Sequence, residues 1–285
     1  MENSFNTSAR VLEINIKEGE EKAAMPLFKC ILLGMMAGGF IAFGAAASNA
    51  AIHNISNQGI AKVLAGAIFS VGLMMIVMIG GELFTGDCLM IAGVADKRIS
   101  IRKMIRTLGI VWLSNLIGAV IIAVLIYFSG LLDYTSGGLG AFTIKIAYGK
   151  CMIEPLQAVC SGILCNIMVC AAVLMTTAAK DISGKIGAIF FPIMTFVIGG
   201  WEHCVANMFY IPAGIIASMN DTYVTKAEEL YGITAQQISE KVNIGGFIFN
   251  QIPVTIGNVL GGMIFMALPL YIIHNGRRNA KSMCK

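Results

Sequence analysis

Charge is scarce in this sequence. Asp, Glu, Lys and Arg make up only 13% of its 285 residues, whereas 57% are hydrophobic and the mean hydropathy is +0.78. Soluble domains carry about 25% charged residues, so this composition excludes a soluble globular protein. A bilayer core takes about 20 apolar residues to cross, and the chain supplies six apolar regions of that length. The sequence predicts an all-α integral membrane protein with a six-span domain over residues 26–275, an amphipathic segment at 1–25 and a basic tail at 276–285.

Motifs that would define an enzyme are also missing. The sequence has no Walker or dinucleotide-binding motif and no H-E-x-x-H, and Glu202-His203 has no second buried histidine beside it. An intramembrane hydrolase is therefore a poor alternative, and we expect no enzyme activity. A neutral-solute channel of the aquaporin type is the other alternative, but its half-helices normally begin with Asn-Pro-Ala, which this sequence lacks.

Metal and disulfide frameworks are equally unsupported. The eight cysteines contain no C-x-x-C pair, and no histidine stands at ligand spacing from any of them. We expect no metal and no cofactor. Residues 1–25 contain acidic side chains and no apolar core segment, so they do not read as a cleaved signal peptide. They predict either a short amphipathic helix on the cytoplasmic surface or a disordered tail.

The basic residues that are present lie beside the ends of the apolar regions. That placement predicts the orientation of a multi-pass protein in the plasma (inner) membrane and gives no reason to expect nucleic acid as a partner. With six spans, fifteen Lys and Arg fall on one side and five on the other, which places both termini in the cytoplasm. The fifteen are Arg10, Lys17, Lys22, Lys29, Lys97, Arg98, Arg102, Lys103, Arg106, Lys180, Lys185, Arg277, Arg278, Lys281 and Lys285, and the five are Lys62, Lys145, Lys150, Lys226 and Lys241.

Two of the apolar regions are interrupted by ionisable residues. In each break, Ile-Gly-Gly precedes a carboxylate: 80–86 contains Glu82, and 199–207 contains Glu202 and His203. Ionisable residues inside a span are costly and indicate a functional site. A pair of glycine-interrupted spans at corresponding positions is typical of a transport site built from broken helices.

The two halves of the chain correspond beyond these breaks. Asn115 and Gly118 in the third span match Asn258 and Gly261 in the sixth. Three spans in each half predict two repeats inserted with opposite orientation, over residues 26–130 and 150–275. Further expectations are a glycine-rich external loop at 129–149, Thr85 and Asp87 as caps of the resumed half-helix in span two, and a small external helix within 220–243.

The breaks predict a site for a small anion. A resumed half-helix directs its N-terminal N–H groups and partial positive charge toward the bilayer centre. His203 is the one histidine deep in a span, and a histidine that titrates near neutrality can donate a hydrogen bond or a proton to a weak-acid anion. The alternative is a structural histidine. For Glu202 we expect a loop-orienting role through backbone N–H bonds.

The two breaks resemble the signature loops of the formate/nitrite transporter family. The resemblance covers 81–86, 201–208 and most of the chain from the first to the sixth span. It implies an aquaporin-like protomer, a homopentamer in the lipid bilayer with one pore per subunit, and transport of formate, nitrite, hydrosulfide, lactate or acetate. Protons are the further partner that we expect, from the chemistry of His203. Formate is the preferred anion because the pore residues are of the common types; nitrite and hydrosulfide stay open, as does the choice between a channel and a proton-coupled transporter.

The resemblance also assigns roles to individual residues. Thr85 matches the mobile-loop threonine and His203 the central histidine, while Lys150 matches a vestibule lysine. The surroundings of Lys150 depart from the family at Met152 and Ile153. The amides near Lys150 are those of Asn166 and Asn207, and the two hydrophobic constrictions are Phe69 with Leu73 and Val169 with Phe196.

Overall fold

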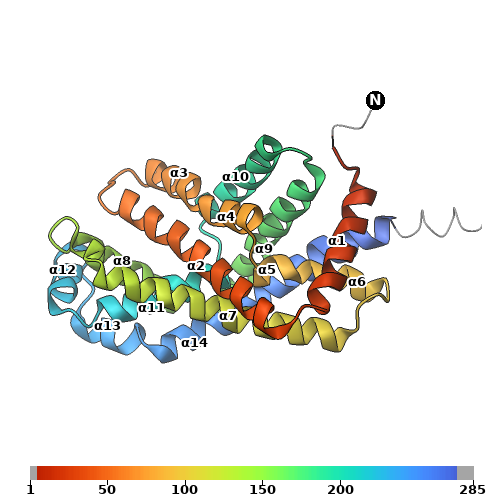
Figure 1. The fold of residues 1–285 in the computed structure, drawn as a ribbon. Coiled ribbons are helices and arrows are strands. Elements are labelled where there is room, and N and C mark those ends of the chain that lie inside the picture. Colours follow the sequence, from red (N-terminus) through yellow and green to blue (C-terminus); the bar gives the residue numbers. More distant parts are fainter. Residues whose placement is uncertain (1–4, 275–285) are drawn as a thin grey trace, which may run out of the picture.

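The protein is described by a computed structural model of residues 5–274, which form an elongated bundle of helices (Figure 1). Six of these helices are long and apolar enough to cross a membrane, which confirms the predicted all-α six-span fold. Their bounds are α2 (Leu27–Ile52), α3 with α4 (Gln58–Phe69 and Val71–Ile79), α7 (Ile101–Phe128), α9 (Pro155–Ala178), α10 (Ile182–Gly199), and α14 (Ile244–Leu260) continued through the π-helical turn η3 (Gly261–Ala267).

The remaining helices are short or lie at the ends of the bundle. They are α1 (Ser8–Ala23), α5 (Phe84–Asp87), η1 (Cys88–Met90), α6 (Ile91–Ala95), η2 (Leu131–Asp133), α8 (Gly138–Cys151), α11 (Cys204–Ala217), α12 (Asp221–Tyr231) and α13 (Ala235–Lys241). The last two confirm the helical segment predicted within 220–243, as two helices instead of one.

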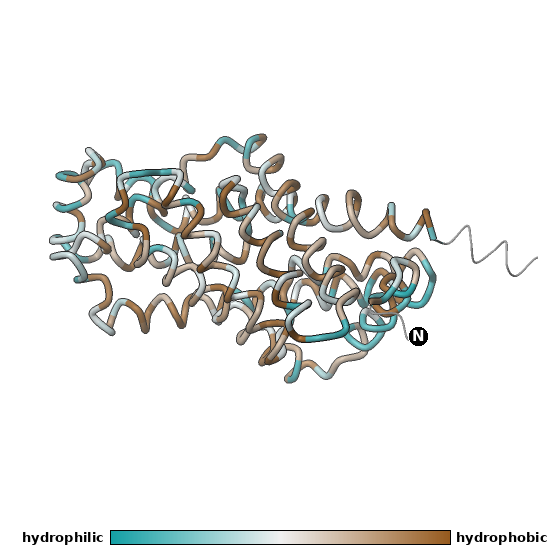
Figure 2. Tube along the Cα trace, turned by 90° about the horizontal axis from the view of Figure 1, so that it is seen from above, coloured by the Kyte–Doolittle hydropathy of each residue, from teal (hydrophilic) through white to brown (hydrophobic). Residues whose placement is uncertain are grey.

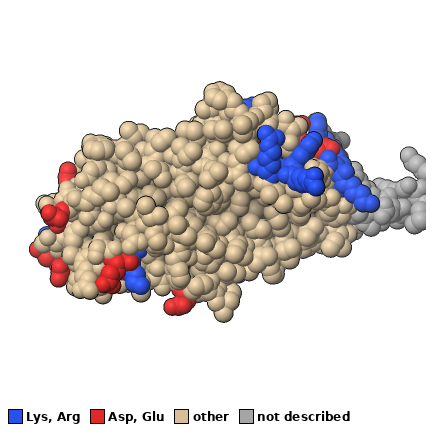
Figure 3. Space-filling model, turned by 90° about the horizontal axis from the view of Figure 1, so that it is seen from below, with Lys and Arg blue, Asp and Glu red and all other residues tan. Residues whose placement is uncertain are grey.

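Polar and charged residues gather at the two ends of the bundle. Hydrophobic positions dominate its middle (Figure 2). On the face shown in Figure 3, Lys and Arg cluster at the end that carries α1 and the start of α7, where Lys97, Arg102 and Arg106 are exposed. Acidic residues such as Asp221 and Glu240 are exposed at the other end. This distribution matches a protein that spans a membrane.

Each broken span bends at a glycine with positive φ. Gly80 has φ 109° and follows α4, and Gly200 has φ 67° and follows α10. A residue with a side chain rarely adopts these conformations, so glycine lets both helices stop abruptly inside the bundle. The chain then runs extended for a few residues before α5 and α11 begin.

The prediction that Thr85 and Asp87 cap the first resumed helix is wrong, because α5 already begins at Phe84. The Phe84 N–H donates instead to the side-chain oxygen of Asn115 on α7 (3.0 Å). The Asn115 amide nitrogen donates in turn to the carbonyls of Gly34 (2.8 Å) and Glu82 (2.9 Å). A side chain from a neighbouring span therefore satisfies the backbone groups that the break leaves free.

The second break is held in the same way by Asn258 on α14. Its side-chain oxygen accepts the Cys204 N–H (2.9 Å), and its amide nitrogen donates to the carbonyls of Gly162 (2.8 Å) and Glu202 (2.9 Å). The equivalence of Asn115 with Asn258 that the sequence suggested therefore holds atom by atom.

Small residues let the paired spans approach closely. Across the α2–α7 contact, a Cβ added at Gly38 would lie about 2.0 Å from a carbonyl oxygen, and one added at Gly118 about 1.9 Å. Across the α9–α14 contact, the corresponding distances are about 2.3 Å for Gly257 and about 2.4 Å for Gly261. Membrane helices use such glycines because lipid gives no hydrophobic drive for association.

The stretch predicted as an external loop at 129–149 contains a helix, and that prediction is wrong. Despite its glycines, α8 buries an apolar face that includes Leu139 and Ile144, and it packs against α11 and α12. Burial outweighs the low helix propensity of glycine here.

The N-terminal segment is helical, as one of the two alternatives predicted. Helix α1 buries Leu12 and Ile16 against the bundle, and Arg98 binds Glu13 and Glu20 on its outer side. It precedes α2 as α8 precedes α9, so each half contains an additional short helix that the predicted repeat boundaries omitted.

Candidate functional site: two vestibules joined through an apolar constriction

Two cavities enter the bundle from opposite ends. The larger has a volume of about 700 Å³ and lies beside α3, α8 and α12, and the smaller has about 440 Å³ and lies beside α1 and the first break. We call them the outer and the inner vestibule, after the orientation that the Lys and Arg distribution predicts. Between them a void of about 10 Å³ is lined by Ile41, Phe69, Leu73, Leu83, Val169, Ile193, Phe196 and His203.

All four predicted constriction residues line this void, but they pair differently from the prediction. Phe69 and Phe196 meet edge to face with ring centroids 5.6 Å apart, and both also line the outer vestibule. Leu73 and Leu83 line the inner one. The outer constriction is thus a pair of phenylalanines from the two broken spans, not Phe69 with Leu73.

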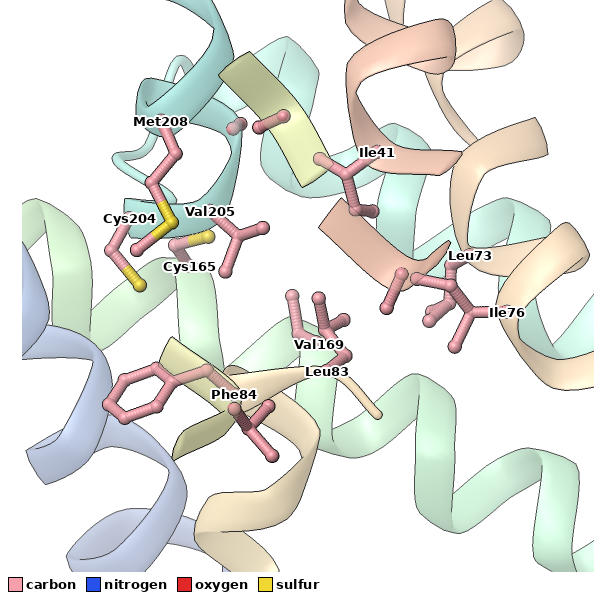
Figure 4. Packing of buried hydrophobic residues seen from close by; sticks show 14 of the residues in the cluster. Ile41, Leu73, Ile76, Leu83, Phe84, Cys165, Val169, Cys204, Val205 and Met208 are labelled. Carbon is pink, nitrogen blue, oxygen red and sulfur yellow. The ribbon is translucent and has the colours of Figure 1, made fainter. Parts of the chain in front are cut away.

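The constriction is completed by aliphatic side chains that were not predicted from the sequence. Leu83 from the first break lies beside Val169 of α9, and Leu73 faces them from α4 (Figure 4). Ile41 contributes from α2. The signal for Leu83 was present, because it stands one residue after the carboxylate in the first break, as His203 does in the second.

His203 is buried at the void, and its side chain caps the N-terminus of α11. Its Nδ1 accepts the N–H of Ala206 (3.1 Å) at the start of α11, and its Nε2 lies 2.9 Å from Thr85 Oγ1. A neutral imidazole has one acceptor and one donor nitrogen. With Nδ1 accepting, Nε2 carries the proton and donates to Thr85, so the ring fits this arrangement in its neutral form.

Thr85 is a direct neighbour of His203 in the buried network. It is hydrogen-bonded directly to the imidazole, is fully buried, and does not line the void. Because its oxygen accepts from His203, its hydroxyl proton is free to turn toward another acceptor. Thr85 therefore holds the imidazole through this hydrogen bond without itself lining the void.

Lys150 lines the outer vestibule, in contact with the second break. Its Nζ lies 2.7 Å from Glu202 Oε1, and Glu202 Oε2 accepts from the Asn207 amide (2.6 Å). Asn207 also donates to Asn250, whose own amide binds the Lys150 carbonyl. We predicted that Glu202 accepts hydrogen bonds from backbone N–H groups. Its carboxylate is bound by the Lys150 and Asn207 side chains instead.

Asn166 takes no part in the network around Lys150. Its amide nitrogen donates to the carbonyls of Thr85 (3.2 Å) and Asn258 (2.6 Å). It thus binds the backbone of the first break at Thr85 and links it to α14, whose Asn258 side chain holds the second break.

A second charged group, not predicted as a unit, lies at the first break. Lys22 of α1 reaches Glu82 Oε2 (2.7 Å) and Asp87 Oδ1 (2.5 Å), and all three line the inner vestibule. Burial lowers the pKa of Lys22, but the carboxylates of Asp87 and Glu82 outweigh it and hold that pKa above its ordinary value. The sequence signal was the correspondence of Asp87 with Asn207 in the two breaks.

Comparison with known proteins places this architecture in a family. The sequence matches the family model described as "Formate/nitrite transporter" over residues 9–272. The chain belongs to the formate/nitrite transporter family. Its broken spans and the constriction between them are therefore features of a membrane transport protein, not of an enzyme.

Relatives within the formate/nitrite transporter family cover nearly the whole chain. A "Probable formate transporter" of Methanothermobacter thermautotrophicus is 38% identical over 94% of this chain and 96% of its own length. The "Formate channel FocA" of Escherichia coli strain K12 is 31% identical, with 93% of each chain covered. A solved structure described as "Pentameric formate channel with formate bound" superposes with a TM-score of 0.76 at 31% identity, covering 87% of this chain and 97% of the other.

Proposed function

We propose that this protein carries formate across the plasma membrane, together with a proton, along a path from the outer vestibule past His203 to the inner vestibule. The observation that carries the proposal is the position of His203 as the one polar side chain lining the apolar void that separates the two vestibules. The formate named in the descriptions of its relatives supports this choice of anion.

The void favours a neutral solute over a bare anion. Its lining is otherwise aliphatic and aromatic, and moving an ionised carboxylate into such surroundings costs far more than moving a neutral acid. Formate is the anion of a weak acid, so one proton removes this barrier. His203 is placed to donate that proton, or a hydrogen bond, to a carboxylate that enters from either side.

The geometry distinguishes these two roles. A hydrogen bond requires only the neutral ring, with Nε2–H turning from Thr85 to the carboxylate. Transfer of the proton requires a ring protonated on both nitrogens, which gives up the Nδ1 bond to Ala206. We propose the transfer: a proton from water in the vestibule of entry converts the neutral ring to imidazolium. Imidazolium plus formate then gives neutral imidazole plus formic acid, which releases its proton to water in the opposite vestibule.

We propose the same assembly and orientation that the sequence predicts. Five copies would each contain one pore, by analogy with the solved pentameric channel. Both termini and the turn at 96–100 would face the cytoplasm, since Lys and Arg gather at that end. A cysteine replacing Arg102 should resist an impermeant maleimide added to intact cells, whereas one replacing Glu229 should react; the opposite pattern would invert the orientation. Arg277 and its neighbours lie outside the described residues.

The test is uptake of labelled formate into sealed proteoliposomes. Excess unlabelled formate should compete fully, and an inward proton gradient should accelerate uptake. Nitrite and hydrosulfide serve as the competing candidates in parallel assays. Faster uptake of either one, with formate ineffective as a competitor, would reassign the substrate within the family, and proton-independent flux of formate would contradict the coupling.

A further inference from the structure

The outer vestibule is lined by positive side chains without acidic ones. Lys62, Lys145 and Lys150 line it, and the described lining contains no Asp or Glu. Lys150 is already bound to Glu202. Within the described chain no ion pair holds Lys62 or Lys145, so their charge is available to a solute.

Lys145 is placed by aromatic rings instead of by a carboxylate. Its Nζ lies 4.4 Å from the ring centroid of Tyr231 on α12 and 5.6 Å from that of Phe142 on α8, and both rings line the same cavity. The face of an aromatic ring attracts an ammonium group without neutralising its charge. The N–H groups of the ammonium stay available as hydrogen-bond donors. The contact therefore fixes a full positive charge, with donors to spare, at the wall of the vestibule.

We propose that Lys145, held over Tyr231, and Lys62 on α3 form an anion-capture site at the mouth of the outer vestibule, separate from Lys150 at its base. The ligands are small monovalent anions, carboxylates included. As a step in formate uptake the site rests on the proposed function, whereas anion capture itself does not. The external helices α12 and α13 expose Asp221, Glu229 and other acidic residues, so the site counters the repulsion that an approaching anion meets there.

Trp201 provides a readout that needs no transport. It lines the outer vestibule, and the chain has only one other tryptophan, Trp112, which contacts Thr255 within the bundle. In a Trp112→Phe background, quenching of fluorescence by iodide reports the local concentration of a small anion. Quenching by neutral acrylamide reports physical access alone.

The experiment compares Lys145→Gln, Lys62→Gln and their double variant with Lys226→Gln, all in the Trp112→Phe background. Lys226 lies on the same external end but pairs with Glu229 and does not line the cavity, which makes it the matched control. One unit charge roughly 10 Å away in a high-dielectric medium changes anion concentration about twofold, so the double variant should lose about fourfold in iodide quenching at low ionic strength. Added salt of about 1 M should abolish the difference, and acrylamide quenching should stay unchanged.

A second arm links capture to transport. The double variant should raise the half-saturating formate concentration by about the same fourfold at low ionic strength and leave the maximal rate unchanged. Tyr231→Leu keeps the charge but frees it, and should give a smaller increase. Iodide quenching in the double variant equal to that of Lys226→Gln would overturn the site. Reduced quenching without formate uptake would instead sustain the site and reject formate as substrate.

Discussion

The two breaks share one framework and differ in what stands inside it. In both, an asparagine from a neighbouring span binds the carbonyl of a glutamate and the N–H two residues later, which makes Leu83 the structural counterpart of His203. The two breaks therefore share one backbone framework, and the second carries an imidazole where the first carries an aliphatic side chain.

The same comparison separates the two ends electrostatically. At the first break Lys22 faces two carboxylates, Glu82 and Asp87, whereas at the second Lys150 faces one, and Asn207 takes the place of Asp87. Lys22 therefore has one acidic partner more than Lys150 has.

Removing the shared asparagines tests the framework and should have the largest effect. Asn115→Leu or Asn258→Leu removes the partner of one N–H and of one glutamate carbonyl in the break, at about 1–3 kcal/mol for each buried group. The third partner of each asparagine is a carbonyl inside a helix, which keeps its backbone hydrogen bond. We expect both variants to lose most of their folded, monodisperse protein in detergent, measured by size-exclusion chromatography. Asn54→Ala, at an exposed amide, is the control. Loss in one variant and full recovery in the other would show that the two frameworks are not equivalent.

Close helix packing provides a smaller and better matched test within α7. Gly118→Ala would bring a Cβ to about 1.9 Å from the Met35 carbonyl, whereas an alanine at Gly109 of the same helix meets nothing within 4 Å. We expect Gly118→Ala to lower stability by about 1–3 kcal/mol through overpacking and Gly109→Ala to be neutral or slightly stabilising. Thermal denaturation followed by light scattering measures both. Equal melting temperatures would refute the close approach.

Removing Lys22 should lower the stability of the protein more than removing Lys150, because Lys22 has two carboxylate partners and Lys150 has one. Lys22→Met leaves two carboxylates without their ion-pair partner. Lys150→Met leaves only one, and that carboxylate still accepts a hydrogen bond from Asn207. Both lysines are only partly buried, so we expect about 2–3 kcal/mol for the first and about 1 kcal/mol for the second, below the range for fully buried pairs. Asp87→Asn should restore much of the stability of Lys22→Met. An unchanged melting temperature for Lys22→Met would show that the ion pair does not hold α1.

Periodicity and composition were sufficient to predict the spans, the breaks and the internal repeat. Long apolar regions and Ile-Gly-Gly followed by a carboxylate depend on local sequence, so they are visible without coordinates. Helix α8 was missed because its glycines suggest a loop and only tertiary burial reveals its apolar face. The caps were misassigned for a related reason, since Asn115 acts from another span.

For the site residues, too, the sequence indicates which side chains are unusual but does not indicate which of them lie in contact. His203 could be singled out because an ionisable residue in a span is rare, and its side chain lines the void. Which side chains face each other could not be read from spacing: Phe69 meets Phe196, and Lys22 joins Glu82 over a separation of sixty residues. These contacts follow from the crossing of helices and not from any local pattern.

The most direct measurement of the central claim is formate uptake against external pH in proteoliposomes containing His203→Asn. Asparagine is a good N-cap and retains an amide donor, so α11 and the pentamer should form normally, as size-exclusion chromatography would show. It cannot carry a proton near neutrality. The account predicts that the variant loses the acceleration of uptake by an inward proton gradient; normal assembly with an unchanged pH dependence would contradict it and leave His203 a structural residue.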